Sequence, residues 1–326
     1  MKDAVRAGYA EVAGEDFSGK AEALARIASS FGYGAEDLAA LPDGANMGLS
    51  CGNPVAMASL QPGETVVDLG SGGGLDVFLA ARAVGPQGQA IGIDMTQEMV
   101  ALARDNAAHD GYGNVAFHHA AIESMPLADG SADCVISNCV LNLVDDKNAA
   151  LAEIFRVLKP GGRLAISDIA LKKPLPPELA GDVTAWVSCI AGAVTIESYA
   201  QALAAAGFRD ADVVPTGADL NVYKEAGESS CCAPAAEPSP AQSCCGSEPE
   251  PDPKKSCCGS APEPEAEAAQ SCCGAESEPK ETEAQSCCHS EPNQTASGFH
   301  AALTSSLQAL DLNDYAAAVR IFAVKP

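Results

Sequence analysis

An apolar run that leads through an acid into a glycine-rich turn constrains this chain more than any other feature. Residues 66–69 read Val-Val-Asp-Leu, and residues 70–74 read Gly-Ser-Gly-Gly-Gly. A helix-compatible run follows from Leu75 to Arg82. Glycine allows a sharp turn and lets the backbone approach a nucleotide-like ligand closely. We therefore expect a strand, a ligand-binding turn and a helix in succession.

A second acid completes this pattern. Asp94 lies twenty residues after Gly74, at the end of another apolar run. A carboxylate there can accept hydrogen bonds from both hydroxyls of a ribose. The turn fits Gly-x-Gly-x-Gly better than the dinucleotide pattern Gly-x-Gly-x-x-Gly, and Asp68 lies just before it. This spacing resembles the S-adenosylmethionine site of class I methyltransferases.

Helix and strand signals alternate along the chain. Strands are expected at residues 65–69, 90–94, 115–119, 133–137, 163–168 and 212–214, and helices at 75–83, 97–109, 147–157 and 196–206. This alternation predicts an α/β fold with a mostly parallel, Rossmann-like sheet and helices on both faces, as in class I methyltransferases. Lys-Pro-Gly-Gly at residues 159–162 predicts a helix stop and a turn.

We expect the chain to divide into five segments. They are an N-terminal helical cap with part of the substrate site (1–60), the S-adenosylmethionine-binding domain (61–171), a substrate-site segment with a strand (172–225), a disordered insertion (226–298), and a terminal helix and strand (299–326). The best helical pattern in the cap covers residues 21–31. The last strand, residues 318–324, is short and isolated, so it must pair with the main sheet. The insertion therefore precedes the last strand of the fold.

The insertion has a composition unlike the rest of the chain. It contains no Val, Ile, Leu, Met, Phe, Tyr or Trp, so it cannot bury enough apolar surface to offset its conformational entropy. It holds thirteen acidic residues and three lysines, a large part of the net charge of −25. So acidic a chain repels phosphate backbones, and we expect no nucleic-acid partner.

Ten of the fourteen cysteines form five Ser-Cys-Cys repeats in this insertion, spaced by 13 or 15 residues. The pairs are Cys231 and Cys232, Cys244 and Cys245, Cys257 and Cys258, Cys272 and Cys273, and Cys287 and Cys288. Residues 1–6 lack an apolar export signal, and no apolar run approaches the length of a membrane span. We therefore expect a cytoplasmic protein with reduced thiols and no membrane partner.

The cofactor residues follow from the position of each strand end, because ligands of open α/β sheets bind outside the carboxyl ends of the strands. Asp68 is expected to approach the methionine amino group, and Gly70 and Gly72 to allow close approach of the cofactor. Asp94 is expected to bind the ribose, and Met95 to flank the adenine.

The third strand adds a dipeptide to this set. Ile122 and Glu123 are expected to pack on the adenine and to form a hydrogen bond with it. The alternative for Asp68, Asp94 and Glu123 is a loop or helix-capping acid.

Three cysteines outside the insertion flank the expected methyl-transfer cleft. Cys139 follows the fourth strand, where many amino-directed methyltransferases have Asn/Asp-Pro-Pro-Tyr/Phe, and Cys51 lies in a Gly-Asn-Pro turn context before the cofactor domain. Cys189 follows the fifth strand. Thiolates select soft centres, and no histidine falls in a cleft motif. A small buried core residue is the alternative reading of a lone cysteine, and it is the one we favour for Cys134.

These motifs together resemble arsenite S-adenosylmethionine methyltransferases. The resemblance rests on Ser-Cys-Gly-Asn-Pro, Asp-Leu-Gly-Ser-Gly-Gly-Gly, Gly-Ile-Asp-Met-Thr, Ser-Asn-Cys-Val-Leu-Asn-Leu, Arg-Val-Leu-Lys-Pro-Gly-Gly and Trp-x-x-Cys-x-x-Gly-Ala, and it covers residues 1–225 and 299–326. It implies that Cys51, Cys139 and Cys189 bind trivalent arsenic. It also implies arsenic detoxification, with a thiol cycle regenerated by thioredoxin or glutathione.

Arsenic chemistry suits a site without a general base. Arsenic(III) bound by three sulfurs keeps a lone pair that can itself attack the sulfonium methyl group. The protein then needs positioning and a dry pocket more than a proton acceptor.

Two other functions remain open at this point. A carbon methyltransferase of the quinone-biosynthesis type shares the glycine and Asp-Met-Thr motifs. A thiol-rich metal sequestration protein would use the cysteine pairs as its active part. Within the arsenic reading, the pairs either capture arsenite or another soft ion for the cleft, or belong to a spacer.

Overall fold

A computed structural model shows the fold and describes residues 2–15, 20–176, 189–222 and 311–326. The cysteine-pair insertion and the helical pattern expected at residues 299–310 lie outside the described residues, as does Trp186 of the Trp-x-x-Cys motif.

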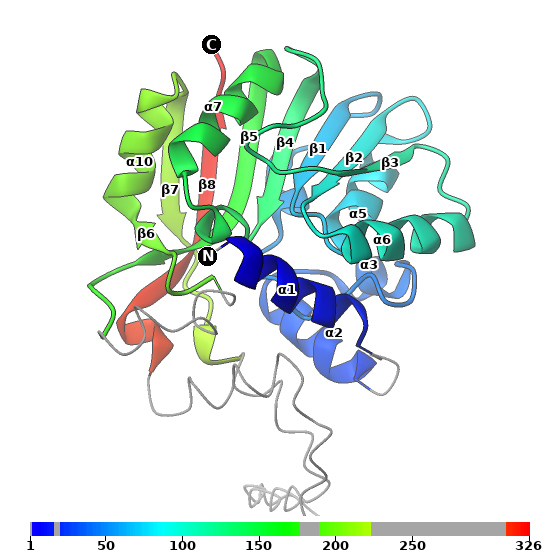
Figure 1. Ribbon diagram of the computed structural model, residues 1–326, viewed down its shortest axis with the longest axis horizontal. Helices are drawn as coiled ribbons and strands as arrows, with labels where there is room; N and C mark the ends of the chain where they lie inside the picture. Colours follow the sequence, from blue (N-terminus) through cyan, green and yellow to red (C-terminus); the bar gives the residue numbers. More distant parts are fainter. Residues whose placement is uncertain (1, 16–19, 177–188, 223–310) are drawn as a thin grey trace, which may run out of the picture. The chain divides into compact units, whose positions relative to one another are not determined.

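One sheet of eight strands forms the centre of the described fold (Figure 1). Its strands are β1 (Thr65–Leu69), β2 (Gln89–Asp94), β3 (Val115–His119), β4 (Ala132–Asn138), β5 (Leu158–Leu171), β6 (Val194–Thr195), β7 (Arg209–Pro215) and β8 (Ala316–Val324). The order is β3-β2-β1-β4-β5-β8-β7, and β6 pairs with the end of β5. All the pairings are parallel except those of β8, which runs antiparallel to β5 and β7.

Helices lie on both faces of this sheet and at one edge of it. They are α1 (Lys2–Ala13), α2 (Ala21–Ser30), α3 (Ala35–Ala39), α4 (Pro54–Ala58), α5 (Leu75–Val84), α6 (Gln97–His109), α7 (Lys147–Val157) and α10 (Ile196–Ala205), with short 3-10 turns η1 (Leu141–Leu143) and η3 (Leu312–Asp314). Helices α4, α5 and α6 share one core cluster with the sheet, and α7 and α10 share another. Of the helices that precede β1, α1 and α2 lie beyond the carboxyl ends of the parallel strands (Figure 1).

The strand alternation explains the two core layers. Val66 packs in the cluster under α5, whereas its neighbour Val67 packs in the cluster under α7, because successive side chains of a strand point to opposite faces. Phe78 of α5 is fully buried on the first face, and Ile154 of α7 on the second. Burying one such side chain stabilises the fold by about 1.5–3 kcal/mol.

The sheet register brings the polar strand ends together. Leu69 of β1 pairs with Ile93 of β2 and with Ser137 of β4, so Asp94 and Asn138 follow at the same edge. The strand ends that the sequence predicted to carry the site therefore do lie next to one another.

The turn predicted at residues 159–162 is wrong. Helix α7 ends at Val157 as predicted, but β5 begins directly at Leu158 and runs through this segment. The Gly161 amide donates to the Lys325 carbonyl at 2.8 Å, and the Lys325 amide donates to the Gly162 carbonyl at 2.9 Å. Pairing with the end of the chain thus overrides the local turn signal, which survives only as a positive φ of 78° at Gly161.

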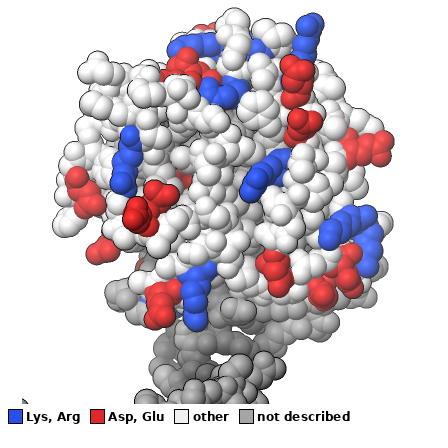
Figure 2. Space-filling view, turned by 180° about the vertical axis from the view of Figure 1, so that it is seen from behind, with Lys and Arg blue, Asp and Glu red and all other residues white. Residues whose placement is uncertain are grey.

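The surface of the described part carries charges of both signs. Figure 2 shows acidic and basic side chains interspersed over one face, among many uncharged ones. Within the described residues, no helix is long and apolar enough to cross a membrane.

Candidate active site

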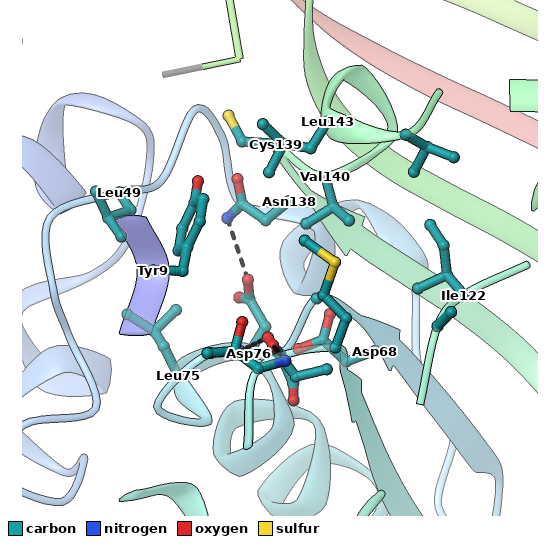
Figure 3. A pocket seen from close by; sticks show the side chains of 18 of the residues that line it. Tyr9, Leu49, Asp68, Leu75, Asp76, Ile122, Asn138, Cys139, Val140 and Leu143 are labelled. Atoms are coloured by element: carbon teal, nitrogen blue, oxygen red, sulfur yellow. Dashed lines mark hydrogen bonds between the residues drawn. The ribbon is translucent and has the colours of Figure 1, made fainter. Parts of the chain in front are cut away.

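A cavity that is partly open to solvent lies at the carboxyl ends of β1, β2 and β4; we call it the main cavity (Figure 3). All seven residues that the sequence assigns to the cofactor line it: Asp68, Gly70, Gly72, Asp94, Met95, Ile122 and Glu123. The helical cap contributes to its wall through Lys2 and Tyr9 of α1, and through Met47, Leu49 and Ser50 before α4.

The glycine-rich turn needs glycine at the positions nearest the cavity. Gly70 and Gly72 have φ values of 66° and 50°, which residues that carry a side chain rarely adopt. A Cβ atom at Gly70 would also collide with the side chain of Val140. The Gly70 amide donates to the Ile93 carbonyl at 2.7 Å, which ties the turn to the end of β2.

Asp94 holds this turn in place and faces the cavity. Its carboxylate accepts hydrogen bonds from the Gly72 amide at 2.9 Å and from the Thr96 amide at 2.8 Å. Burial raises the pKa of Asp94, although both amides oppose this shift. Each oxygen has a second lone pair, so Asp94 can order the loop and still accept from a ribose hydroxyl.

Two further carboxyls make the main cavity strongly acidic. Asp68 is the next-to-last residue of β1, Asp76 lies in the first turn of α5, and both are buried. Burial raises the pKa of Asp68, and the negative charges of Asp76 and Asp94 raise it further. Burial raises the pKa of Asp76 to about 6. A cationic ligand would relieve this repulsion, because an opposite charge favours the ionised carboxylates.

Few positively charged side chains line the main cavity to balance these acids. Among the described residues of the lining, Lys2 is the one basic side chain, and it pairs with Glu123 at 3.0 Å. The buried hydroxyl of Ser71 also lines the cavity and has no hydrogen-bond partner within the described structure. The sulfonium, ammonium and hydroxyl groups of S-adenosylmethionine fit this combination of acids and a spare polar group.

Asn138, at the end of β4, connects the main cavity with the loop before α4. Its side-chain amide donates to Asp76 at 3.1 Å (Figure 3) and to the Gly52 carbonyl at 2.9 Å. Its amide oxygen accepts from the Cys51 amide at 3.0 Å. The hydroxyl of Tyr33 donates to Asp76 at 2.7 Å and completes the network. One side chain therefore fixes both the acid in the cavity and the loop that carries Cys51.

The three cysteines singled out by the sequence meet beside this network; we call them the thiol cluster. The sulfur atoms of Cys51 and Cys139 are in contact, and their Cα atoms lie 6.0 Å apart, within the range of a disulfide. The Cys189 thiol donates to the Cys139 carbonyl at 2.5 Å. All three residues are buried, and of the three only Cys139 lines the main cavity.

The backbone at two of these cysteines is strained. Cys139 and Cys189 have φ values of 57° and 66°, in the left-handed region that non-glycine residues rarely occupy. Such a conformation costs about 1–3 kcal/mol and is typical of functional sites. A hydrogen bond of 2.8 Å from the Cys139 amide to the Ser167 carbonyl holds the strained turn on β5.

The surroundings of Cys189 keep its thiol protonated. Burial raises its pKa well above the usual value, and the negative charge of Asp168 adds to this effect. Lys147 and a hydrogen bond with Tyr9 act in the opposite direction but are weaker. A ligand that forms a bond to the Cys189 sulfur therefore has to displace the thiol proton.

Comparison with known proteins shows the family. A model of the methyltransferase domain matches residues 60–207. The arsenite methyltransferase of Halobacterium salinarum is 45% identical over 205 residues, which are 63% of this chain and 52% of that protein. A crystallised arsenic(III) S-adenosylmethionine methyltransferase from Chlamydomonas reinhardtii is 30% identical, with 62% of this chain and 69% of that chain covered, at a TM-score of 0.45. The chain belongs to the arsenite methyltransferase family.

A further solved structure resembles this chain in its fold. The geranyl diphosphate C-methyltransferase of Streptomyces coelicolor has a TM-score of 0.53 at 16% identity, covering 83% of this chain and 74% of that one. At that identity the likeness shows the class I methyltransferase fold alone, as the sequence predicted. The chain spans about half the length of the curated arsenite methyltransferases it matches.

The sequence missed several residues that build the site. Asp76 looks like an ordinary acid in the first turn of a helix, and Tyr9 and Tyr33 look like core residues of the cap. Asp168 gave a usable signal, because it is the one charged residue inside the mainly apolar run 164–171. Cys134 lies fully buried in the core cluster under α5, in line with a packing role.

Proposed function

We propose that this protein transfers a methyl group from S-adenosylmethionine to trivalent arsenic held by the thiol cluster. One observation carries the proposal: Cys139 lines the main cavity and also contacts Cys51, while Cys189 is hydrogen bonded to its backbone. Residues separated by 88 positions in the chain thus place sulfur directly beside the cavity suited to the methyl donor. The expected role in the cell is arsenic detoxification.

The main cavity supplies the binding groups for the cofactor. When bound, S-adenosylmethionine supplies an electrophilic methyl group. Asp68 receives the amino group, Asp94 the ribose hydroxyls, and Gly70 and Gly72 let the backbone come close. Met95 and Ile122 provide apolar surface for the adenine, and Glu123 offers it a hydrogen-bond acceptor. These assignments follow from the positions of the residues at the carboxyl ends of the strands.

The thiol cluster supplies the binding groups for arsenic. Each thiol that binds arsenous acid replaces one hydroxyl, and its proton leaves with that hydroxyl as water. Arsenic stays trivalent and keeps its lone pair, so the chain needs no base to activate it. Among the described residues that line the main cavity there is no histidine, and the burial of all three cysteines keeps water away from the arsenic.

The contact between Cys51 and Cys139 suits the second half of the cycle. Methyl transfer raises arsenic from the trivalent to the pentavalent state. Two thiols that form a disulfide release two electrons and two protons, which returns arsenic to the trivalent state. An external thiol of the glutathione or thioredoxin class then reduces the disulfide by exchange.

Methyl transfer from labelled S-adenosylmethionine tests the proposal. The protein is incubated with excess thiol and either arsenite or a demethylated quinone precursor, and labelled products are separated by chromatography. We expect labelled methylarsenicals and no labelled quinone. Labelled quinone without methylarsenicals would replace the proposal by the carbon methyltransferase function that shares the glycine motifs.

A further inference from the structure

Asp168 is a buried acid that the reaction as described leaves without a role. It lies in β5, is fully buried, and belongs to the carboxyl-end region near the thiol cluster. One of its oxygens accepts from the Asn142 side chain and from the Ile169 amide, both at 2.8 Å. The core thus fixes this carboxyl group firmly in one orientation.

The second oxygen of Asp168 has spare accepting capacity. The Tyr199 hydroxyl lies 3.1 Å from it and 2.7 Å from the amide oxygen of Asn142. A hydroxyl has one proton, so Tyr199 can serve only one of these acceptors fully, and Asn142 is the nearer. A buried oxygen with an incomplete set of donors favours a ligand that brings one.

Asp168 offers its free accepting position to the thiol cluster, where arsenic is proposed to bind. A carboxylate oxygen of Asp168 and the sulfurs of Cys51 and Cys139 all lie within 4.8 Å of one another. The Cys189 sulfur is instead engaged with the Cys139 carbonyl. With the Cys189 sulfur held in this way, the third group that faces an atom bound to Cys51 and Cys139 is the carboxylate oxygen of Asp168.

We propose that Asp168 binds the hydroxyl group that remains on arsenic when Cys51 and Cys139 have replaced the other two. This inference rests on the function proposed above. Arsenous acid and two thiols give a dithiolate of arsenic with one hydroxyl, together with two molecules of water. The hydroxyl donates a hydrogen bond to Asp168, which holds arsenic in place until Cys189 displaces the hydroxyl as a third water. Arsenic stays trivalent throughout.

The proposal separates two substrates. Methylarsonous acid has two hydroxyls, so after Cys51 and Cys139 have bound, none is left to meet Asp168. Asp168 therefore favours arsenite over methylarsenite. A purely structural role in the core would affect both substrates alike.

The test compares the two substrates in wild type and in Asp168→Asn. We expect kcat/KM for arsenite to fall about 10- to 100-fold, the effect of losing one hydrogen bond to a charged group, and kcat/KM for methylarsenite to change less than about threefold. Dissociation constants measured by calorimetry without S-adenosylmethionine should show the same difference. Asp105→Asn, on the exposed face of α6, is the control for removing a carboxylate.

Three outcomes decide the matter. An equal fall for both substrates, or none for either, would overturn the role of Asp168. A wild type that methylates neither substrate would instead overturn the proposed function. If Asp168→Asn does not fold, Cys189→Ala provides the second test: the two remaining thiols and Asp168 should still bind arsenite, with two sulfurs and one oxygen around arsenic by X-ray absorption, and complete loss of binding would contradict the proposal.

Discussion

Asn138 and Cys139 are adjacent residues whose side chains contact two different parts of the proposed site. The Asn138 side chain is bound to Asp76 in the main cavity, and the Cys139 sulfur contacts Cys51 in the thiol cluster. The left-handed backbone at Cys139 permits this change of direction directly after β4. The proposed sites for the methyl donor and for arsenic are thus joined through two consecutive residues, which limits the distance between them.

Asp94 makes a first prediction at this scale. Asp94→Asn removes a charged acceptor for the ribose and loosens the hold on the Gly72 amide. We expect the dissociation constant of S-adenosylmethionine to rise about 10- to 100-fold in calorimetry. Asp105→Asn serves as the control and should leave it unchanged. An unaltered affinity in Asp94→Asn would mean that the carboxylate only orders the loop.

Asp76 makes a prediction about pH. Its pKa is about 6 in the folded protein against 3.8 as the reference value, so between these values the folded state binds a proton that the unfolded state does not. The contribution of Asp76 to stability is therefore present at low pH and is lost as pH rises from about 4 to about 6. In Asp76→Asn the free energy of unfolding should fall less steeply over this range.

Urea unfolding from pH 4.5 to 7.5 checks the slope. The lost hydrogen bonds of Asp76 lower stability by a similar amount at every pH, so only the slope reports the titration. Equal slopes for wild type and Asp76→Asn would show that Asp76 stays ionised in the folded state.

The elements explain why so much of the fold could be predicted from the sequence. Apolar runs that end in Asp68 and Asp94 mark two strands and their carboxyl ends at once, and β1, β3, α6 and α7 have the predicted bounds. The residues that line the main cavity could be placed for the same reason, because they lie at or shortly after the carboxyl ends of β1, β2 and β3. The assignments failed where a distant segment decides the local structure, as at residues 159–162, which pair with the end of the chain.

Long-range contacts also explain what the sequence analysis missed in the site. Nothing near Asp76 indicates that Tyr33 and Asn138 will surround it, since they lie 43 and 62 residues away. The proximity of Asp168 to Cys51 likewise depends on the packing of the loop before α4 against β5, not on spacing. Such clusters exist only in the folded chain.

Strand β8 gives a prediction at the scale of elements. Ile321 is fully buried and lies between Ile166 of β5 and Val213 of β7. Ile321→Ala should lower the free energy of unfolding by about 2–5 kcal/mol in urea. Arg320→Ala, an exposed position on the same strand, should lower it by less than about 0.5 kcal/mol. Similar small losses in both variants would mean that β8 is not a core strand.

At the scale of the whole molecule, the segment between residues 222 and 311 begins and ends at the same place. The Asn221 side chain donates to Asp311 at 2.8 Å, and the Leu220 amide donates to the side-chain oxygen of Asn313 at 3.0 Å. These hydrogen bonds hold the residue before the segment and the residue after it next to each other. A short linker can therefore replace the cysteine-pair insertion without separating β7 from β8.

Deletion of residues 226–298 with a Gly-Ser linker tests this view. We expect the thermal midpoint to change little, because the bonds between residues 219–221 and 311–313 remain. The same variant distinguishes the two interpretations of the cysteine pairs. Lower turnover at limiting arsenite, with normal turnover at saturation, supports capture; unchanged turnover at both concentrations supports a spacer.

The thiol cluster beside the main cavity is the central claim, and one pair of variants tests it most directly. Labelled methyl transfer to arsenite is measured with excess thiol for wild type, Cys139→Ser and Cys134→Ser. Cys134 is a buried cysteine of β4, the strand that Cys139 follows, and lies outside the cluster. We expect Cys139→Ser to lose methylarsenical formation while it still binds S-adenosylmethionine, and Cys134→Ser to keep it once corrected for folded protein. Full turnover in Cys139→Ser would contradict the account.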